Sequence, residues 1–477
     1  MYERFGLLLD GAWRPAEGGL APVVSPVTER PLGEAPVATR ADTEAAIESA
    51  ARGLAAWSAR SAFERADALH AIADEMIRRA DEAARMIATE TGKPIAQAAR
   101  EWVLSTDQFR WYAEEARRIY GRIVESRVPG GRFEVTREPI GIVAAFTAWN
   151  FPAALVARKV APALAAGCAI IVRPSSQTPG VAMVMLDCCR AGNLPEGVVN
   201  LVVGPTSATY APIMDSPLVR KVSLTGSTRV GQQMIRDAAA TMKKVTMELG
   251  GNAPLIVFDD ADLETALDVS VPTKFANAGQ VCVTPDRFFV HESLHDAFVD
   301  GFAARARALR LGDGLDPATQ MGPLINGGRL AEIEGVIEDA VKAGARVAAG
   351  GGRARDFNAG FFHEPTVLAD VTDDMKVFAE ENFGPIAAIT RFASDDEALG
   401  RANASEMGLS AYAFTKDAKR ARRAVAELKA GMVGINSFAM AASEAPFGGT
   451  KYSGMGREGG SEGISDYLDT KLAQIVL

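Results

Sequence analysis

Strand-like and helix-like segments alternate along residues 141–242. Short apolar runs at residues 141–146, 169–172, 200–203 and 221–224 are separated by helix-like stretches at residues 153–166, 180–191 and 231–242. A strand, a crossover helix and a second strand in this order form a right-handed βαβ unit. The alternation therefore predicts a mostly parallel sheet with helices on both faces.

The chain is too long for a single hydrophobic core. It has 477 residues, which exceeds the size at which one core stops growing, so at least two large domains are expected. Residues 40–120 have apolar residues at helical spacing, residues 122–137 alternate around a Pro-Gly-Gly turn as a hairpin does, and a second α/β stretch covers residues 255–449. The last residues, 467–477, again have the pattern of a strand.

Charge and apolar content exclude several classes of partner. The chain has 51 basic and 60 acidic side chains, a net charge of −9, and no basic block, so neither nucleic acid nor an anionic membrane is expected to bind. The longest apolar stretch carries Asn150 and Pro152 at its centre and suits a buried strand followed by a turn better than a membrane span. The apolar stretch at the N-terminus, before Asp10, is too short for a signal peptide. Four cysteines without framework spacing favour a reducing, cytoplasmic location, and Cys168, Cys188 and Cys189 are expected to be structural.

Two glycine-flanked segments carry the residues of most chemical interest. Glu248 is followed by Leu-Gly-Gly, and Cys282 lies 34 residues later after Gly279-Gln-Val. A thiol with an unshifted pKa of about 8.5 is roughly 10% thiolate near pH 7.5, and a nearby carboxylate can activate the water that releases a covalent adduct. The pair therefore predicts an enzyme that binds its substrate through sulfur.

These two segments resemble the signature segments of the aldehyde dehydrogenase superfamily. Further matches occur in the family's order, at 147–152 (Thr-Ala-Trp-Asn-Phe-Pro), 173–175 (Arg-Pro-Ser), 224–231 (Leu-Thr-Gly-Ser-Thr-Arg-Val-Gly), 381–385 (Glu-Asn-Phe-Gly-Pro) and 446–449 (Pro-Phe-Gly-Gly). The amino-acid sequences of these motifs are most similar to those of the succinate semialdehyde dehydrogenase-like members. The resemblance covers the chain from Ile140 to Leu477.

The resemblance implies an α/β architecture of three parts. These are a Rossmann-like NAD(P)-binding domain at residues 1–120 and 141–251, an α/β catalytic domain at residues 252–450, and a small β bridging domain at residues 121–140 and 462–477. In the family the bridging domain extends the sheet of a neighbouring subunit, so a homodimer or homotetramer is expected.

Four catalytic residues follow from the resemblance. Cys282 would form a thiohemiacetal and then a thioester, Glu248 would activate the hydrolytic water, and Asn150 with the Cys282 backbone N–H would stabilise the oxyanion. Lys159 would support proton relay. The structural alternatives are a buried thiol for Cys282, a carboxylate before a turn for Glu248, a helix cap for Asn150 and a surface position for Lys159.

The cofactor site follows in the same way. No GxGxxG motif stands at the end of a predicted strand, but Gly226 and Ser227 follow a strand and open a helix whose free N–H groups suit a pyrophosphate. Glu381 would hold the nicotinamide ribose, with Phe383 beside that ring; loop packing is the structural alternative for both. The cofactor-binding residues expected are Thr147, Trp149, Arg173, Ser175, Ser176, Gly204, Gly226, Ser227, Gly231, Leu249, Glu381 and Phe383.

One departure from the family pattern bears on the choice between NADP and NAD. Ser176 stands where most NAD-preferring relatives carry a glutamate that repels a 2′-phosphate, and Arg173 adds a cation suited to phosphate. We therefore expect NADP to be favoured slightly over NAD, with both usable.

The substrate expected is a small-molecule aldehyde, in particular an acid semialdehyde such as succinate semialdehyde, oxidised to the free acid. Arg158 matches an arginine that holds a distal carboxylate, whereas Ala276 and Ala441 stand where a second arginine and a serine would complete that site. An apolar aliphatic or aromatic aldehyde contacting Phe438, Met440 and Trp149 is the alternative.

Other activities remain as alternatives. A coenzyme A-acylating relative typically lacks the glutamate that Glu248 represents, and an inactive descendant would not be expected to retain all the catalytic residues. A zinc peptidase is suggested only by His291-Glu-Ser-Leu-His295. Because His291 is expected to end a strand and the helix to begin at residue 292 or 293, the two imidazoles would diverge, and no metal site is predicted.

Overall fold

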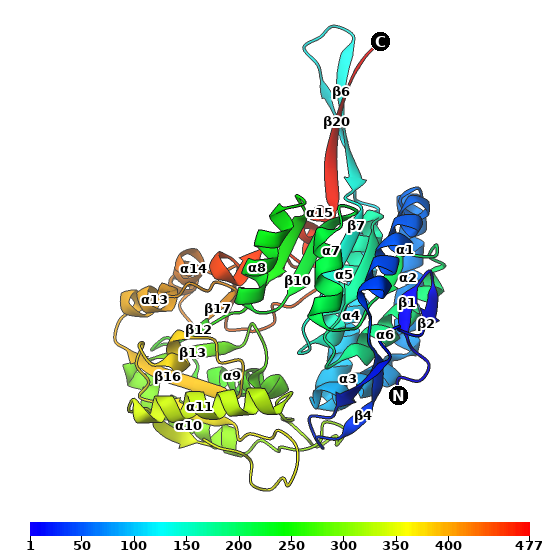
Figure 1. Ribbon diagram of the computed structural model, residues 1–477. Helices are drawn as coiled ribbons and strands as arrows, with labels where there is room; N and C mark the ends of the chain where they lie inside the picture. The colour runs from blue at the N-terminus through cyan, green and yellow to red at the C-terminus, as the bar shows by residue number, and fades with distance from the viewer.

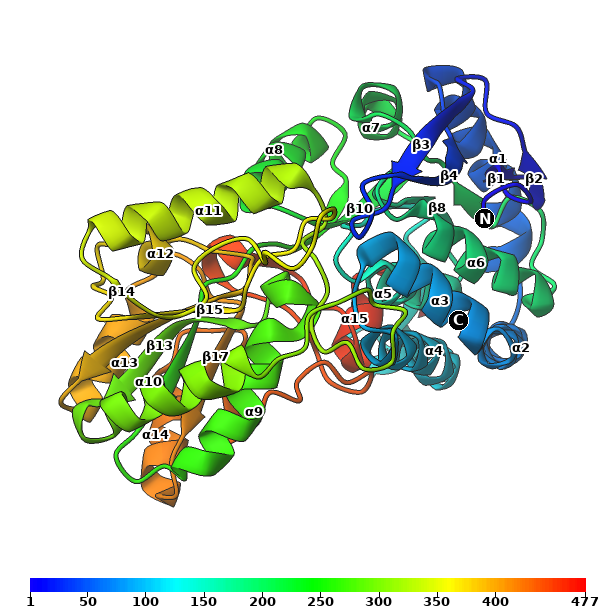
Figure 2. The same cartoon turned by 90° about the horizontal axis from the view of Figure 1, so that it is seen from below.

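The computed structural model describes residues 1–477 and consists of two α/β lobes and a projecting three-stranded sheet (Figure 1). Seen from below, the lobe built from the first half of the chain and the lobe built from residues 253–435 lie side by side (Figure 2). The α/β fold class predicted from the sequence is confirmed.

The first lobe is built on an eight-stranded sheet in the order β19-β11-β10-β7-β8-β9-β1-β2. Its strands are β1 (Leu7–Leu9), β2 (Ala12–Arg14), β7 (Ile142–Phe146), β8 (Ala169–Arg173), β9 (Val199–Leu201), β10 (Val219–Thr225), β11 (Lys244–Glu248) and β19 (Gly454–Met455). Strands β11, β10, β7, β8 and β9 are parallel, and β1 and β19 pair with them in the antiparallel sense.

Helices cover both faces of this sheet because successive strand residues point to opposite sides. Val143 and Ile170 pack into one apolar core, whereas Ala144 and Ile171 pack into a second core on the other face. The helices of this lobe are α1 (Arg40–Ser58), α2 (Ala62–Arg78), α3 (Ala80–Thr91), α4 (Ile95–Ala116), α5 (Pro152–Ala166), α6 (Pro179–Cys188), η1 (Cys189–Gly192), α7 (Thr206–Asp215) and α8 (Thr228–Ala239). Cys168, Cys188 and Cys189 are buried and unpaired, as expected of structural cysteines.

The second lobe is built on a seven-stranded sheet in the order β14-β15-β16-β13-β12-β17-β18, in which only β14 is antiparallel to its neighbour. Its strands are β12 (Ala253–Val257), β13 (Pro285–His291), β14 (Arg346–Ala349), β15 (Thr366–Ala369), β16 (Ile386–Phe392), β17 (Ser410–Phe414) and β18 (Met432–Ile435). Its helices are α9 (Leu263–Phe275), η2 (Ala276–Gly279), α10 (Glu292–Arg307), α11 (Gly327–Lys342), α12 (Lys376–Ala379), α13 (Asp395–Asn403) and α14 (Ala418–Glu427).

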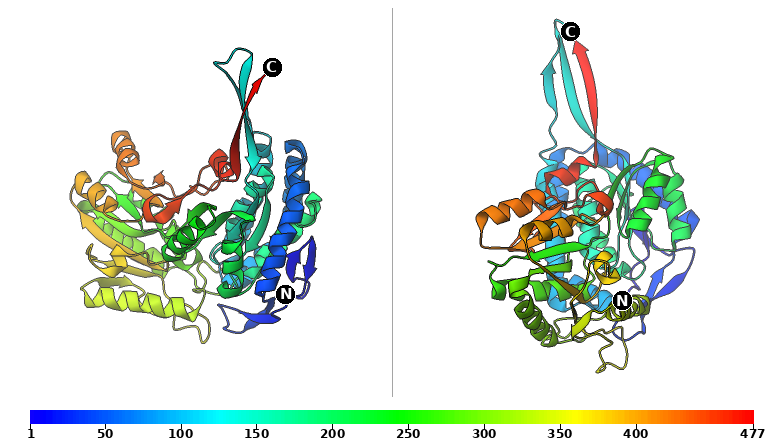
Figure 3. Two further views of the ribbon diagram at one scale, coloured as in Figure 1. Left: turned by 45° about the horizontal axis from the view of Figure 1, so that its top comes forward. Right: turned by 90° about the vertical axis from the view of Figure 1, so that its left-hand side faces the viewer.

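Three further elements complete the fold. The hairpin β5 (Arg122–Glu125) and β6 (Gly131–Pro139) pairs with β20 (Leu468–Val476) to form the sheet that projects from the body in both views of Figure 3. Helix α15 (Gly460–Ser465) packs on α4 and α5, and η3 (Lys451–Ser453) precedes β19. The short hairpin β3 (Leu20–Val24) and β4 (Pro31–Pro36) forms a fourth sheet. No helix combines the length and the apolar character needed to cross a membrane.

Candidate active site

Several of the site residues predicted from the sequence lie at the carboxyl ends of the parallel strands, along one edge of the sheet. Glu248 ends β11 and is paired with Thr225 at the end of β10, and Phe146 at the end of β7 is paired with Arg173 at the end of β8. Ligands of open α/β sheets bind at this edge, where loops and helix N-termini meet. The segments that follow Phe146, Thr225 and Glu248 therefore converge there.

The segment before Cys282 has an unusual backbone. Asn277, Ala278 and Gly279 have φ values of 49°, 54° and 72°, so three successive residues are left-handed, a conformation that non-glycine residues rarely adopt. A Cβ atom at residue 279 would collide with the carbonyl of Gly384, so only glycine fits. This loop thus packs directly on the 381–385 segment.

The thiol of Cys282 is less acidic than an ordinary cysteine. Desolvation, followed by the carboxylates of Glu381 and Glu248, raises its pKa to about 12, and Arg158 opposes this shift. The sequence-based estimate of a one-tenth thiolate fraction is therefore wrong: burial and nearby acids, which a local motif does not reveal, keep the free thiol protonated. The backbone N–H of Cys282 donates to no backbone carbonyl, so it is available to an oxyanion.

Glu248 is a buried carboxyl without a hydrogen-bond partner. Its side chain is 3% exposed, and neither carboxyl oxygen has a protein partner. Burial raises its pKa well above the usual range, Glu458 raises it further, and Lys159 and Arg158 oppose the shift. A buried polar group without a partner is costly, so this carboxyl is placed for a water or ligand.

Lys159 is not a surface residue. Its ammonium is fully buried and donates to Thr225 Oγ1 at 2.8 Å and to Oε1 of Glu458. Glu458 was missed by the sequence analysis, although it lies between glycines 456 and 459, the same signal that identified Glu248. Lys159, Glu458 and Glu248 therefore form one buried group of ionisable side chains that influence one another.

Asn150 does not cap a helix. The N-cap of α5 is Phe151, and the Asn150 side-chain amide donates instead to the carbonyl of Gln280 at 3.2 Å. Its side-chain oxygen is buried without a partner. The structural alternative of a capping asparagine is thus wrong, and the contact brings Asn150 to the loop that carries Cys282.

The start of α8 has the form of an anion-binding site. Ser227 is the N-cap, its hydroxyl accepts from the Val230 N–H, and Gly226 immediately precedes it. A Cβ at Gly231 would collide with the side chain of Leu249, so this glycine allows α8 to approach the end of β11 closely. Free N–H groups at such a helix start suit a phosphate.

Glu381 contacts the glycines that follow Glu248, and Phe383 contacts Trp149. Glu381 accepts the Gly251 N–H at 3.0 Å, burial raises its pKa to about 8, and a Cβ at Gly250 would collide with its carboxylate. Phe383 has φ 48° and meets the Trp149 ring edge-on at 5.6 Å. The strained position of Phe383 beside Trp149 brings the 147–152 and 381–385 segments together.

Arg173, Ser175, Ser176 and Gly204 lie near one another. Arg173 donates to the carbonyl of Gly204 at 2.9 Å and Ser175 accepts the Gln177 N–H. Ser176 is exposed and, with Gly204, lines a cavity of about 630 Å³ that β3 and β4 also border. None of the cavity-lining residues is acidic. The buried Thr147 hydroxyl and Arg173 Nε have no hydrogen-bond partner.

Arg158 is a nearly buried cation that pairs with no carboxylate. It is 7% exposed, stacks at 4.1 Å over the Phe447 ring, and makes no hydrogen bond or ion pair. Phe447 belongs to a small apolar cluster on which Cys282 and Met440 pack. Phe438 lies against Tyr412, whose hydroxyl donates to the carbonyl of Val283. Arg158 and Phe438 thus approach the Cys282 region from two sides.

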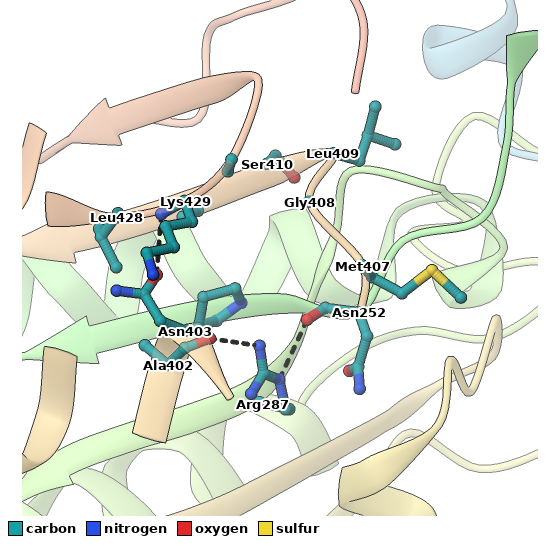
Figure 4. Close-up of a pocket in the computed structure, with 13 residues that line it drawn as sticks. Asn252, Arg287, Ala402, Asn403, Met407, Gly408, Leu409, Ser410, Leu428 and Lys429 are labelled. Atoms are coloured by element: carbon teal, nitrogen blue, oxygen red, sulfur yellow. Dashed lines mark hydrogen bonds between the residues drawn. The ribbon is translucent and has the colours of Figure 1, made fainter. Parts of the chain in front are cut away.

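Two other features are not part of this site. The pocket around Arg287 holds about 10 Å³, roughly one water, and Arg287 fills it by donating to the carbonyls of Asn252 and Ala402 (Figure 4). His291 ends β13 and α10 begins at Glu292, as predicted, so the HExxH pattern does not lie on one helix.

A half-buried thiol, an unpartnered carboxyl and a helix N-terminus lie at one end of a parallel sheet, an arrangement that suits a nucleotide-dependent oxidoreductase. The sequence matches the aldehyde dehydrogenase family over residues 13–473. It is 44% identical to a 3-sulfolactaldehyde dehydrogenase of Pseudomonas putida over 97% of this chain and 95% of the relative. It is 43% identical to the NADP(+) succinate-semialdehyde dehydrogenase of Escherichia coli over 97% and 96%. A crystal structure of succinate-semialdehyde dehydrogenase from Burkholderia pseudomallei superimposes with a TM-score of 0.97, at 43% identity, covering 99% of this chain and 98% of the other.

The chain therefore belongs to the aldehyde dehydrogenase family, and it is an NAD(P)-dependent enzyme. The family assignment made from the sequence motifs is confirmed. The roles of the individual site residues remain predictions.

Proposed function

We propose that this enzyme oxidises an aldehyde bearing a distal acidic group, with succinate semialdehyde as the type substrate, to the free carboxylic acid. The observation that supports it most directly is the unpaired Arg158 guanidinium beside the Cys282 cluster. A buried cation without a counter-ion is costly, and a substrate carboxylate or sulfonate would neutralise it. The names of the relatives fit this substrate class, since they act on carboxylate or sulfonate aldehydes.

The chemistry proposed uses three residues in turn. The Cys282 sulfur adds to the aldehyde carbon as Glu248 takes the thiol proton, and the Asn150 amide with the Cys282 N–H stabilises the oxyanion. The raised pKa of Glu248 makes its carboxylate a stronger base once it is ionised. A bound nicotinamide ring supplies the hydride acceptor. Glu248 then activates the water that hydrolyses the thioester.

The proposal also assigns the proton path and the cofactor preference. Lys159 and Glu458, in contact behind Glu248, would carry protons away from it. Gly226 and Ser227 at the start of α8, with Gly231 packed against Leu249, would bind the pyrophosphate, and the cavity beside Ser176, which no acidic residue lines, would accept a 2′-phosphate, so NADP is favoured over NAD.

The test is a comparison of aldehydes with the purified enzyme. We expect kcat/KM for succinate, glutarate and sulfonate-bearing aldehydes to exceed that for unsubstituted aldehydes of equal length by roughly 10²-fold, with NADP⁺ used faster than NAD⁺. Product analysis with and without coenzyme A should give the free acid in both. Equal rates for neutral aldehydes would favour the apolar alternative, and an acyl-coenzyme A product would favour the acylating one.

Assembly and location are further parts of the proposal. The projecting sheet exposes the large apolar side chains Ile123, Leu472 and Val476, at 71%, 64% and 54%, which supports a homodimer or homotetramer built through that sheet. The domain division predicted from the sequence is part of the same proposal, with residues 121–140 and 462–477 forming the bridging domain. The four unpaired cysteines support a cytoplasmic location. Light scattering of the purified enzyme and cell fractionation test the two points.

A further inference from the structure

An ion pair that none of the predicted roles uses lies beside Asn150. Lys93, in the loop between α3 and α4, and Glu101, on α4, are each 1% exposed and are joined at 2.6 Å. The Lys93 ammonium also donates to the backbone carbonyl of Asn150 at 2.7 Å. Burying two charges costs several kcal/mol of desolvation, and replacing such a pair by apolar residues is often neutral or stabilising, so stability alone does not explain it.

The pair contacts the backbone on both sides of Asn150. Lys93 lies 4.0 Å from the centre of the Phe151 ring. The second oxygen of Glu101 accepts the N–H groups of Ala153 and Ala154, at 2.8 and 3.2 Å, in the first turn of α5. Because the Phe151 N-cap provides no side-chain acceptor, Glu101 takes over the capping of this helix. The ion pair therefore restrains the backbone at Asn150 and immediately after it.

A second set of contacts holds Asn150 from the Cys282 loop. The Asn277 side chain donates to the same Asn150 carbonyl at 3.0 Å and to the Gln280 carbonyl at 3.2 Å. The Asn150 amide donates to that Gln280 carbonyl as well. Lys93 and Asn277 therefore share one acceptor, and this links the start of α5 to the loop that carries the nucleophile.

We infer that Lys93 is a positioning residue for catalysis, which fixes the Asn150 amide relative to Cys282, and that Glu101 holds Lys93 in place. The inference rests on the proposed role of Asn150 at the oxyanion. Oxyanion donors act only at the correct distance, and displacement by about 1 Å can cost up to 10²-fold in rate. Loss of Lys93 should therefore lower kcat and leave cofactor binding unchanged.

The experiment compares Lys93→Met, the double variant Lys93→Met/Glu101→Gln, and both in an Asn150→Ala background. We expect Lys93→Met to lower kcat about 10- to 50-fold, with an unchanged KM for the aldehyde and an unchanged Kd for NADP⁺ measured by fluorescence. If the single variant unfolds because a lone buried carboxylate remains, the double variant removes both charges and should fold, yet kcat should stay low.

Combination with Asn150→Ala separates positioning from a general effect on the fold. A residue that acts only through Asn150 adds nothing once the amide is gone, so the triple variant should match Asn150→Ala within about twofold. Lys243→Met is the matched control, since this buried lysine also donates to two backbone carbonyls but lies immediately before β11, five residues from Glu248. It should keep the wild-type kcat.

The outcomes discriminate between the two proposals. A near wild-type kcat in the double variant, or a further loss of tenfold or more in the Asn150→Ala background, would overturn the role of Lys93 and leave that of Asn150 intact. A wild-type kcat in Asn150→Ala itself would remove the proposed oxyanion role, and this inference with it.

Discussion

Replacing Arg158 by methionine gives a direct measure of how the substrate is recognised. Methionine keeps an apolar stem of similar length against Phe447 but removes the charge. Each hydrogen bond to a charged group contributes about 1.5 to 3 kcal/mol, and a carboxylate left unpaired in a buried site adds to the loss. Since Arg158 is 7% exposed and has no competing partner, we expect a loss of about 3 to 4 kcal/mol for an acid semialdehyde. This is roughly 10²- to 10³-fold in kcat/KM.

The assay is the ratio of kcat/KM for succinate semialdehyde to that for the unsubstituted aldehyde of equal length. A ratio is needed because Arg158 also lowers the pKa of Cys282 and of Glu248, so its loss slows both aldehydes. The two aldehydes differ only in the distal charge, so a change in the ratio reports the recognition of that charge. Arg60→Met, which removes a guanidinium over the Trp57 ring away from the site, is the control. An unchanged ratio in Arg158→Met would refute recognition of an acidic group by this residue.

Four further variants test the remaining roles. Cys282→Ala should abolish aldehyde oxidation and esterase activity while calorimetry shows unchanged cofactor binding, because sulfur forms both acyl intermediates. Glu248→Gln should release about one NADPH per site, more slowly than the wild type because the thiol has lost its base, and then stall, because an amide cannot accept the proton of water. Ser176→Glu should lower kcat/KM for NADP⁺ about tenfold or more and raise that for NAD⁺, because two like charges would meet. Glu381→Gln should flatten the pH dependence of unfolding by urea. With a folded pKa of about 8 against a usual 4.5, the native state keeps a proton that the unfolded chain loses, so wild-type stability falls as pH rises across that interval, by about 5 kcal/mol.

For each of these variants, one result would contradict the prediction. Substantial steady-state turnover in Cys282→Ala would rule out covalent catalysis, and full turnover in Glu248→Gln would remove that residue as the base. If the NADP⁺ to NAD⁺ ratio is the same in Ser176→Glu and wild type, residue 176 does not face the adenosine ribose. A wild-type pH profile in Glu381→Gln would show that other groups cause the decline.

The sequence predicted the parallel strands better than the edges of the sheets. Strands such as β7 and β8 are continuous apolar runs of the kind that buried parallel strands require, and they lie within one or two residues of the expected positions. The strands β1, β2 and β19 were not predicted. They have two or three residues each, and their pairing depends on segments far away in the chain, which no local pattern encodes.

A similar division holds for the site. Glu248 and Cys282 stand beside glycines that permit close approach, so a local pattern identified them. Lys93 and Glu101 carry no such signal, because a lysine before a proline and a glutamate in a helix are ordinary surface patterns, and only the fold buries them. The pKa of Cys282 likewise depends on burial and on Glu381, 99 residues away along the chain. The sequence therefore identified the reacting groups but not the residues that set their acidity and position.

The sheet of the first lobe contains strands from both ends of the chain. β1 spans residues 7–9 and β19 spans residues 454–455, and α15 and β20 follow β19. During synthesis, the edge of this sheet beside Glu248 cannot form until the ribosome has translated more than nine-tenths of the sequence. Residues 253–435, in contrast, hold all the strands of the second sheet and can fold earlier. The nascent first lobe therefore keeps one sheet edge uncovered until the end of synthesis, and such an edge can pair with other chains.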